Sequence, residues 1–206
     1  ASSTRAAYEA VEGVRHAERF AMTQGILKTD EDFLGVMLKG IGQEYDTTFI
    51  SENLVEGSLP QFSDKKTKYP LVISKSIAKK LRVKTGDKLF AYFIGQDDVR
   101  ARRFTICGIY QTNMTQFDQA LCFTDFSVPV KLNGWADDQC SGAEILVDDF
   151  NQLEQTATKI AKLVNSTTDR YGDILTSQTI HEAYPQIFSW LSLLDINVWI
   201  ILVLMI

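Results

Sequence analysis

The sequence predicts an α+β domain that leads into an apolar helix, and three observations support this. The 206 residues are 45% hydrophobic and 23% charged with only 4 Pro, which is the balance of a globular chain. Short segments rich in Phe, Tyr and Ile between residues 89 and 123 are typical of strands. Residues 150–164 instead carry apolar side chains at helical spacing. The length fits one larger domain or two small ones.

The first part of the chain predicts three strands. Residues 11–23 and 33–41 are strand-like, and the glycines within them indicate bends or bulges. Residues 71–73 form a short apolar run that is typical of a buried strand.

A short helix is expected to follow the third of these strands. Ser74 has the side chain of an N-cap, and Ile77, Ala78 and Leu81 then recur on one helical face. The turn at residues 85–87 should lie beyond the end of this helix.

Three more strands are expected at residues 89–94, 102–110 and 120–123, joined by short polar loops. Because they are consecutive and short, we expect them to form a small antiparallel lobe.

The three cysteines are too few and too irregularly spaced for a disulfide scaffold or a zinc site, so we interpret them as small core residues. As an alternative, a hairpin in register would place Cys107 opposite Cys122 and permit one disulfide, with Cys140 left free.

The C-terminal third predicts a strand and then helices. Residues 143–147 are strand-like, and Asp149 should begin an amphipathic helix. The inward stripe of that helix is expected to contain Phe150, Leu153, Ala157, Ile160, Ala161 and Val164.

A further strand is expected at residues 173–176. Ser177 or Thr179 would then open a long helix that runs through residues 184–190, with Pro185 in its first turns or at a kink.

The last segment, IFSWLSLLDINVWIILVLMI, is interpreted as the start of a membrane helix. Its final nine residues carry no charge and would span about 13.5 Å, less than half of a hydrocarbon core of about 30 Å, so we expect a truncated span. The N-terminus shows no signal peptide and is expected to be an excision as well. The alternative is a buried C-terminal helix of a soluble domain.

Several functional classes are excluded or disfavoured. A net charge of −5 without a long basic run argues against a nucleic-acid partner. The sequence lacks a G-x-S-x-G elbow, a completed phosphate loop and a pair of histidines one helical turn apart, because Pro185 stands where the second histidine after His181 would be. We therefore expect no catalysis, no cofactor and no metal.

The order of several short motifs resembles permeases of ABC transporters. The segment LVISKSIAKKL at residues 71–81 with KTGDK at 84–88 resembles the "I-S-x-x-x-A-x-x-L…G-D-x" segment of these permeases. FTICGIY at 104–110 with Phe117 and Asp118 resembles the strand ending in G-I-[FY] and the turn after it. The family is that of FtsX-like permeases of the lipoprotein-releasing (LolC/LolE) or MacB type, and residues 188–197 resemble the start of their second membrane helix in Bacteroides-type sequences.

The resemblance implies a MacB-like periplasmic domain between the first two of four membrane helices. Residues 1–88 and 136–185 would form a discontinuous Porter-like α/β lobe, residues 89–135 a smaller, strand-rich Sabre-like lobe, and residues 186–206 the start of the second membrane helix. The protein would lie in the bacterial inner membrane with this segment on the periplasmic side. One departure is the short interval at residues 95–100, which lacks the longer proline-bearing hook of the chaperone-binding subunit, so chaperone capture is not expected.

The implied partners are a cytoplasmic ABC ATPase subunit, a second permease subunit and a lipoprotein or periplasmic protein. Two functions remain open: movement that releases lipoprotein or exports amphipathic cargo, and FtsX-like transmission of an ATPase signal to a cell-wall hydrolase without transport.

Residues of exposed loops are the candidates for contact with a partner or cargo. For the predicted turn at residues 113–118, the alternative is that Phe117 belongs to the core and that Asp118 only caps the turn. The contact candidates are Gln96, Asp97, Asp98, Arg100, Asn113, Thr115, Phe117 and Asp118, and the candidates for coupling at the membrane surface are Trp190, Asp195 and Trp199.

Overall fold

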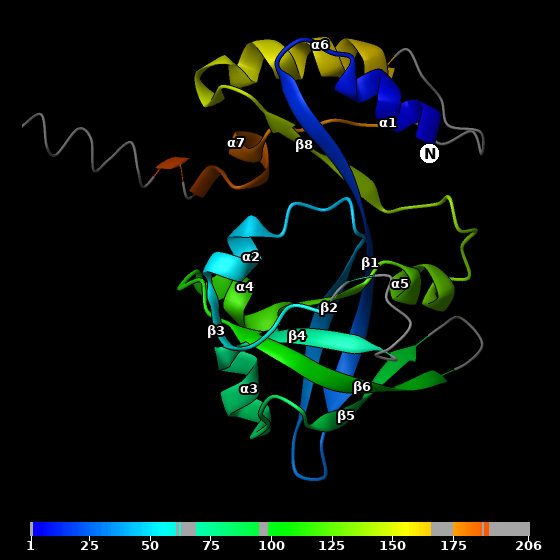
Figure 1. Ribbon diagram of the computed structural model, residues 1–206, viewed down its shortest axis with the longest axis vertical. Coiled ribbons are helices and arrows are strands. Elements are labelled where there is room, and N and C mark those ends of the chain that lie inside the picture. The colour runs from blue at the N-terminus through cyan, green and yellow to red at the C-terminus, as the bar shows by residue number, and fades with distance from the viewer. Residues whose placement is uncertain are drawn as a thin grey trace, which may run out of the picture. The chain divides into compact units, whose positions relative to one another are not determined.

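The computed structural model describes residues 2–60, 62, 69–94, 99–165, 175–186 and 188–189. Helices and strands are interspersed along the described part of the chain (Figure 1). They are α1 (Ser2–Glu9), β1 (Val14–Lys28), β2 (Phe33–Ile41), α2 (Thr48–Glu52), β3 (Leu54–Gly57), β4 (Pro70–Ser74), α3 (Lys75–Leu81), β5 (Lys88–Ile94), β6 (Val99–Tyr110), α4 (Thr115–Ala120), β7 (Leu121–Asp125), α5 (Ser127–Leu132), β8 (Gly142–Val147), the 3-10 turn η1 (Phe150–Gln152), α6 (Leu153–Asn165) and α7 (Ile180–Ala183).

The chain packs into two compact units. Unit 1 contains Ala1–Arg5 and Ala17–Glu144, and unit 2 contains Ala6–His16 and Ile145–Ile206. Strands β1 and β8 each begin in one unit and continue into the other. The division into lobes at residues 89 and 135 stays a prediction.

Unit 1 is built on a mixed sheet whose strand pairs close into a circuit. The order is β2-β7-β4-β6-β5-β1-β8, β3 also pairs with β6, and β1 pairs a second time with β2. Residues 26–28 of β1 therefore pair with β5 on one side and with β2 on the other. A closed circuit leaves few free strand edges, which removes a route to aggregation.

The predicted strand, helix and turn around Ser74 are confirmed. The Ser74 hydroxyl accepts a hydrogen bond from the Ile77 N–H at 3.1 Å, as an N-cap does. The inward face of α3 is buried, and the helix packs against β2, β4 and β6. Gly86, at φ +87°, then lets its own N–H donate to the Ile106 carbonyl, and the Asp87 carbonyl accepts from Ile106 in return. Gly86 and Asp87 thus bind this turn to β6 through backbone hydrogen bonds.

The predicted antiparallel lobe of three consecutive strands is wrong. β5 and β6 form an antiparallel pair, but β4 lies between β6 and β7, parallel to β6 and antiparallel to β7. The hairpin that would oppose Cys107 and Cys122 is therefore not formed, and all three cysteines are free thiols. The short helix α4 reverses the chain after β6, so β7 can pair with β2 instead.

The core of unit 1 lies on both faces of β4, because Leu71 and Ile73 belong to one buried cluster and Val72 belongs to another. β4 is buried at all five positions, whereas β5 alternates buried with more exposed residues, as a strand with one solvent face does. β6 alternates in its middle and is buried at its last three residues. The largest side chains with almost no exposure are Tyr110, Phe104, Leu27, Leu38, Ile41, Leu71, Ile73, Ile77, Leu81 and Ile106.

Unit 2 is held together around helix α6. The Asp148 N–H donates to the Gly13 carbonyl at 3.0 Å, and Lys159 pairs with Glu12 at 2.9 Å. Ile160 of α6 is buried, as its position in the predicted stripe requires. Phe150 was placed in the same stripe, but its side chain is 55% exposed. The reason is that residues 150–152 form a separate 3-10 turn with three residues per turn, which rotates Phe150 out of the stripe.

The long helix expected from Thr179 onward is interrupted. Thr179 is the N-cap, and it forms a capping box with Glu182. Helix α7 nevertheless ends at Ala183, because Tyr184 leaves the helical region at φ −133° and ψ 56° ahead of Pro185, whose ring disfavours a helical residue before it. Residues 175–176 have no regular structure, and the remainder of the strand predicted there lies outside the described residues.

Among the described residues, no helix is both long and apolar enough to cross a membrane. Of the predicted membrane-entering segment 186–206, the structure describes Gln186, Phe188 and Ser189.

Candidate functional site: a polar cluster that joins β1, β2 and β8

The predicted contact turn is a self-contained polar loop. The Asp118 carboxylate is buried and accepts hydrogen bonds from the Thr112 N–H and hydroxyl at 3.1 and 2.8 Å and from the Asn113 N–H at 3.1 Å. Thr115 is exposed, whereas Phe117 is partly buried. Asp118 therefore caps its turn, as the structural alternative stated, and Asn113 and Thr115 remain the members of this group that solvent reaches.

Of the other predicted site residues, the structure describes Arg100. Arg100 lies near the start of β6, and its guanidinium donates to the Leu132 carbonyl of α5 at 3.1 Å. Six predicted residues lie outside the described part of the chain, namely Gln96, Asp97, Asp98, Trp190, Asp195 and Trp199.

A different constellation forms around Lys39, which is only 8% exposed although it belongs to an apolar strand. The Lys39 ammonium lies 2.8 Å from the Tyr45 hydroxyl and 2.5 Å from Glu144 Oε1. It also lies 4.9 Å from the ring centroids of Phe20 and Tyr45, a geometry that favours a cation–π interaction. A buried ammonium is tolerated only when it is paired in this way.

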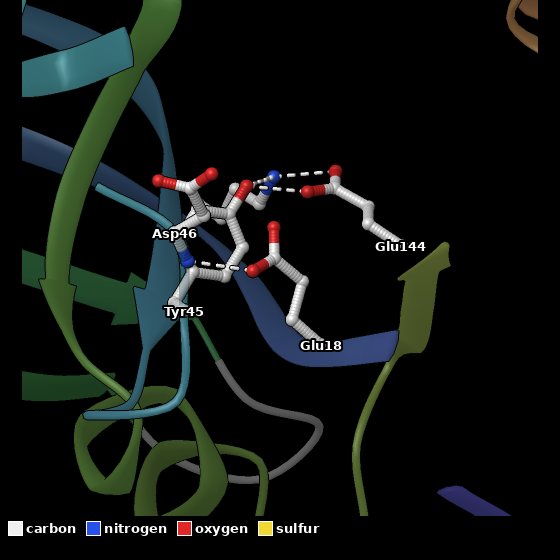
Figure 2. Close-up of polar contacts among 5 residues, drawn as sticks. Glu18, Tyr45, Asp46 and Glu144 are labelled. Carbon is white, nitrogen blue, oxygen red and sulfur yellow. Dashed lines mark hydrogen bonds and ion pairs between the residues drawn. The ribbon is translucent and has the colours of Figure 1, made fainter. Parts of the chain in front are cut away.

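Glu144 completes the group from β8. One of its carboxylate oxygens accepts from Lys39 and the other accepts from the Tyr45 hydroxyl (Figure 2). Three segments therefore meet through charged or charge-assisted hydrogen bonds: β2 through Lys39, the loop after β2 through Tyr45, and β8 through Glu144.

Strand β1 holds the same loop from another side. Glu18 is 2% exposed, and its carboxylate accepts from the Asp46 N–H at 2.6 Å (Figure 2). The neighbouring Arg19 donates to Glu44 at 2.9 Å. The loop at residues 42–47 is thus fixed to both β1 and β8, the two strands that continue into unit 2.

The electrostatics of the cluster keep Tyr45 protonated. Burial raises the pKa of the Tyr45 hydroxyl, and the negative charge of Glu144 raises this pKa further. Burial alone would raise the pKa of Glu44. The hydrogen bond from Arg19 and, to a smaller extent, a backbone hydrogen bond and nearby positive charges together outweigh this effect, so the pKa of Glu44 lies below its usual value. Tyr45 therefore acts as a hydrogen-bond donor to Glu144 at any physiological pH.

The chemistry of the cluster indicates a structural role rather than a catalytic or metal-binding one. In the described part of the chain, every fully buried side-chain nitrogen or oxygen has a hydrogen-bond partner. Within the same ranges, no group of three His, Cys, Asp or Glu side chains is placed to hold a metal ion. The polar groups are engaged with one another, so the cluster can fix segments together and resist their separation.

Sequence reasoning missed this cluster. The available signal was Lys39 inside the apolar segment FLGVMLKGI, because a cation in a buried strand requires an acidic or aromatic partner. The sequence does not say which of 26 acidic residues supplies it, since Glu144 lies 105 positions away.

Comparison with solved structures identifies the fold. The extracellular domain of the noncanonic ABC-type transporter YknZ from Gram-positive bacteria superposes with a TM-score of 0.57 at 18% identity, covering 84% of this chain and 84% of that chain. The periplasmic region of MacB from Actinobacillus actinomycetemcomitans gives a TM-score of 0.54 at 17% identity, covering 80% of this chain and 72% of that chain. No protein-family model matches the chain, and no curated protein matches it in sequence. The predicted α+β, MacB-like fold is confirmed.

Proposed function

We propose that this chain is the extracytoplasmic domain of an ABC-transporter permease that relays movement driven by ATP hydrolysis. The observation that carries the proposal is the fold, which is shared over most of the chain with the domains of YknZ and MacB. ATP hydrolysis belongs to a separate cytoplasmic subunit in this proposal, and a second permease subunit completes the transporter. The domain acts on the periplasmic side of the inner membrane, and its cargo is a lipoprotein or another amphipathic molecule.

The threading of the chain supports a mechanical role. β1 and β8 are strands that continue from one compact unit into the other, and the buried cluster fixes both to the loop at residues 42–47. A displacement of either strand must therefore pull on Glu18 or Glu144 and so on that loop.

The outer face of unit 1 supports contact with cargo or a partner. Antiparallel register places Phe33, Lys28, Phe90 and Arg103 side by side across β2, β1, β5 and β6. Phe33 is 74% exposed and Phe90 is 48% exposed. Exposed apolar side chains gathered on one sheet face indicate an interaction surface.

Affinity purification of the full-length protein from its native membrane tests the assignment. Recovery of an ATPase subunit together with lipoprotein or lipid is the expected result. Recovery of a cell-wall hydrolase without cargo would instead support signal transmission, and the absence of an ATPase would refute the assignment.

A pair of lysine variants tests the mechanical role. Lys39→Met removes the centre of the cluster, and Lys80→Met removes an exposed lysine from α3. In the reconstituted transporter, we expect Lys39→Met to lower the amount of cargo released per ATP hydrolysed and Lys80→Met to leave it unchanged. Equal ratios in the two variants would show that the cluster does not take part in coupling.

A further inference from the structure

Three aromatic rings form a cluster at the start of α6 and around α7. The Phe150 ring stacks on Phe188 at 6.5 Å with an interplanar angle of 18°. The His181 ring stands edge-on to both, 5.6 Å from Phe150 and 4.2 Å from Phe188. His181 also meets Glu154 of α6, with 3.1 Å between Nδ1 and Oε1. The cluster therefore joins α7 to the beginning of α6.

One side of this cluster is open to solvent. Phe150 is 55% exposed, and Ile180, which directly precedes His181, is 48% exposed. Among the described residues of unit 2, these are the two large apolar side chains with high exposure. An aromatic cluster that is packed internally but left uncovered on one side is suited to an apolar environment outside the domain.

The chain itself indicates what this environment is. Phe188 is followed two residues later by Trp190, and the sequence then continues to Ile206 with Asp195 as its single charged residue. Aromatic side chains gather where a chain passes from water into lipid. We propose that Phe150, Ile180 and Phe188 form an interfacial wedge that rests in the headgroup and upper acyl region of the bilayer. The inference rests on the proposed function together with the expectation from the sequence that residues 186–206 begin a membrane helix.

The charges around the wedge predict what kind of lipid it favours. Asp149 accepts hydrogen bonds from its own turn, Glu154 pairs with His181, and Glu182 belongs to the capping box. Of the two lysines of α6, Lys159 is paired with Glu12, and Lys162 lies farther along the helix from Phe150. A surface whose carboxylates are engaged and whose nearer α6 lysine is paired gains from apolar burial rather than from attraction to phosphates. The wedge should therefore bind neutral bilayers as well as anionic ones.

The test uses the full-length protein in nanodiscs of phosphatidylcholine. In a background in which the native cysteines, Cys107, Cys122 and Cys140 among them, are replaced by serine, one cysteine is introduced per variant and labelled with an environment-sensitive fluorophore. The variants are Phe150→Cys and Ile180→Cys in the wedge, Phe49→Cys as a control of matched exposure at 52%, and Leu202→Cys in the predicted membrane segment. Lipids that carry a nitroxide just below the headgroup serve as the quencher.

The expected result is a blue shift and loss of fluorescence at positions 150 and 180, with no change at position 49. Replacing part of the neutral lipid by phosphatidylglycerol should not increase the quenching. Emission at 150 and 180 that resembles position 49, while 202 is quenched, would overturn the wedge and leave the proposed function standing. A blue shift without nitroxide quenching would also overturn it, because a protein surface would then cover the rings. Absence of quenching at 202 as well would count against the proposed function itself.

Discussion

Replacing Tyr45 by Phe removes one hydroxyl from the centre of the buried cluster and keeps the ring. That hydroxyl donates to Glu144 and accepts from Lys39 at 2.8 Å. The Lys39 side chain is 11% exposed, so water cannot readily replace the lost acceptor, whereas the Glu144 side chain is 41% exposed and can be rehydrated. The ion pair between Lys39 and Glu144 remains in the variant.

The expected cost follows from these two bonds. Hydrogen bonds to charged groups contribute about 1.5–3 kcal/mol each. Because the exposed Glu144 can be rehydrated, we count only the bond with Lys39, which gives a loss of about 1.5–2 kcal/mol in the free energy of unfolding. In a chain of this length, 1 kcal/mol shifts Tm by about 2–4 °C, so we expect Tm to fall by about 3–8 °C.

Urea unfolding followed by circular dichroism measures the loss in the free energy of unfolding, with Tyr92→Phe as the control. Within the described part of the chain, the Tyr92 hydroxyl has no hydrogen-bond partner, so its removal should leave the midpoint almost unchanged. If both variants unfold at the same urea concentration, the hydroxyl of Tyr45 does not stabilise the domain and the reasoning fails.

The same side chain gives an alkaline signature. Burial and the charge of Glu144 raise the pKa of Tyr45 above its ordinary value of about 10. Above about pH 10, the folded chain therefore keeps a proton that the unfolded chain loses, and stability must fall as the pH rises, by up to about 1.4 kcal/mol per pH unit. Unfolding midpoints measured at successive alkaline pH values should fall more steeply in the unmodified protein than in Tyr45→Phe. Parallel curves would contradict a raised pKa.

Three further predictions concern other parts of unit 1. Gly57→Ala should destabilise the domain by about 2–3 kcal/mol, because Gly57 has φ +77° and an added Cβ would lie 2.3 Å from the Cys107 carbonyl oxygen. The control is Gly35→Ala, whose added Cβ meets nothing within 4 Å, so thermal melts of this variant should be nearly unchanged. Asp118→Asn should cost about 1–3 kcal/mol in urea unfolding, since an amide N–H₂ replaces one acceptor oxygen, and an unchanged midpoint would mean that the turn does not depend on the carboxylate. Burial raises the pKa of the Cys122 thiol, so a maleimide should label Cys122 only at the rate of unfolding, and rapid labelling in native buffer would refute its burial.

Local features of this fold could be predicted from the sequence because they depend on neighbouring residues. The Ser74 N-cap and the strand at residues 33–41 were expected and are confirmed, since a cap and a run of apolar residues act within one or two turns of chain. The 3-10 turn at Phe150 and the break at Tyr184 show the limit, because there the boundary of a helix depends on backbone choices that apolar spacing does not encode.

The pairing of strands could not be predicted in the same way. β4 enters the sheet between β6 and β7 although it precedes both in sequence, and nothing in residues 70–74 specifies a neighbour. The partners of Lys39 were hidden for the same reason, since Glu144 reaches it only after the sheet has closed. Of the predicted contact residues, those at 113–118 do lie where the chain reverses, but the reversal is made by helix α4 rather than by a hairpin turn, and the buried Asp118 carboxylate serves this segment itself. The contact roles assigned to the loop residues stay predictions.

The division of the chain between its two units has a consequence for synthesis. Apart from Ala1–Arg5, unit 1 is one continuous stretch from Ala17 to Glu144, whereas unit 2 joins residues 6–16 to a segment that begins at Ile145. The partners of Glu12 and Gly13, which are Lys159 and Asp148, leave the ribosome more than a hundred residues later, a delay on the order of ten seconds at usual rates of elongation. The sheet can assemble during that interval, while the N-terminal segment waits. Residues 17–144 can thus fold before unit 2, which becomes complete last.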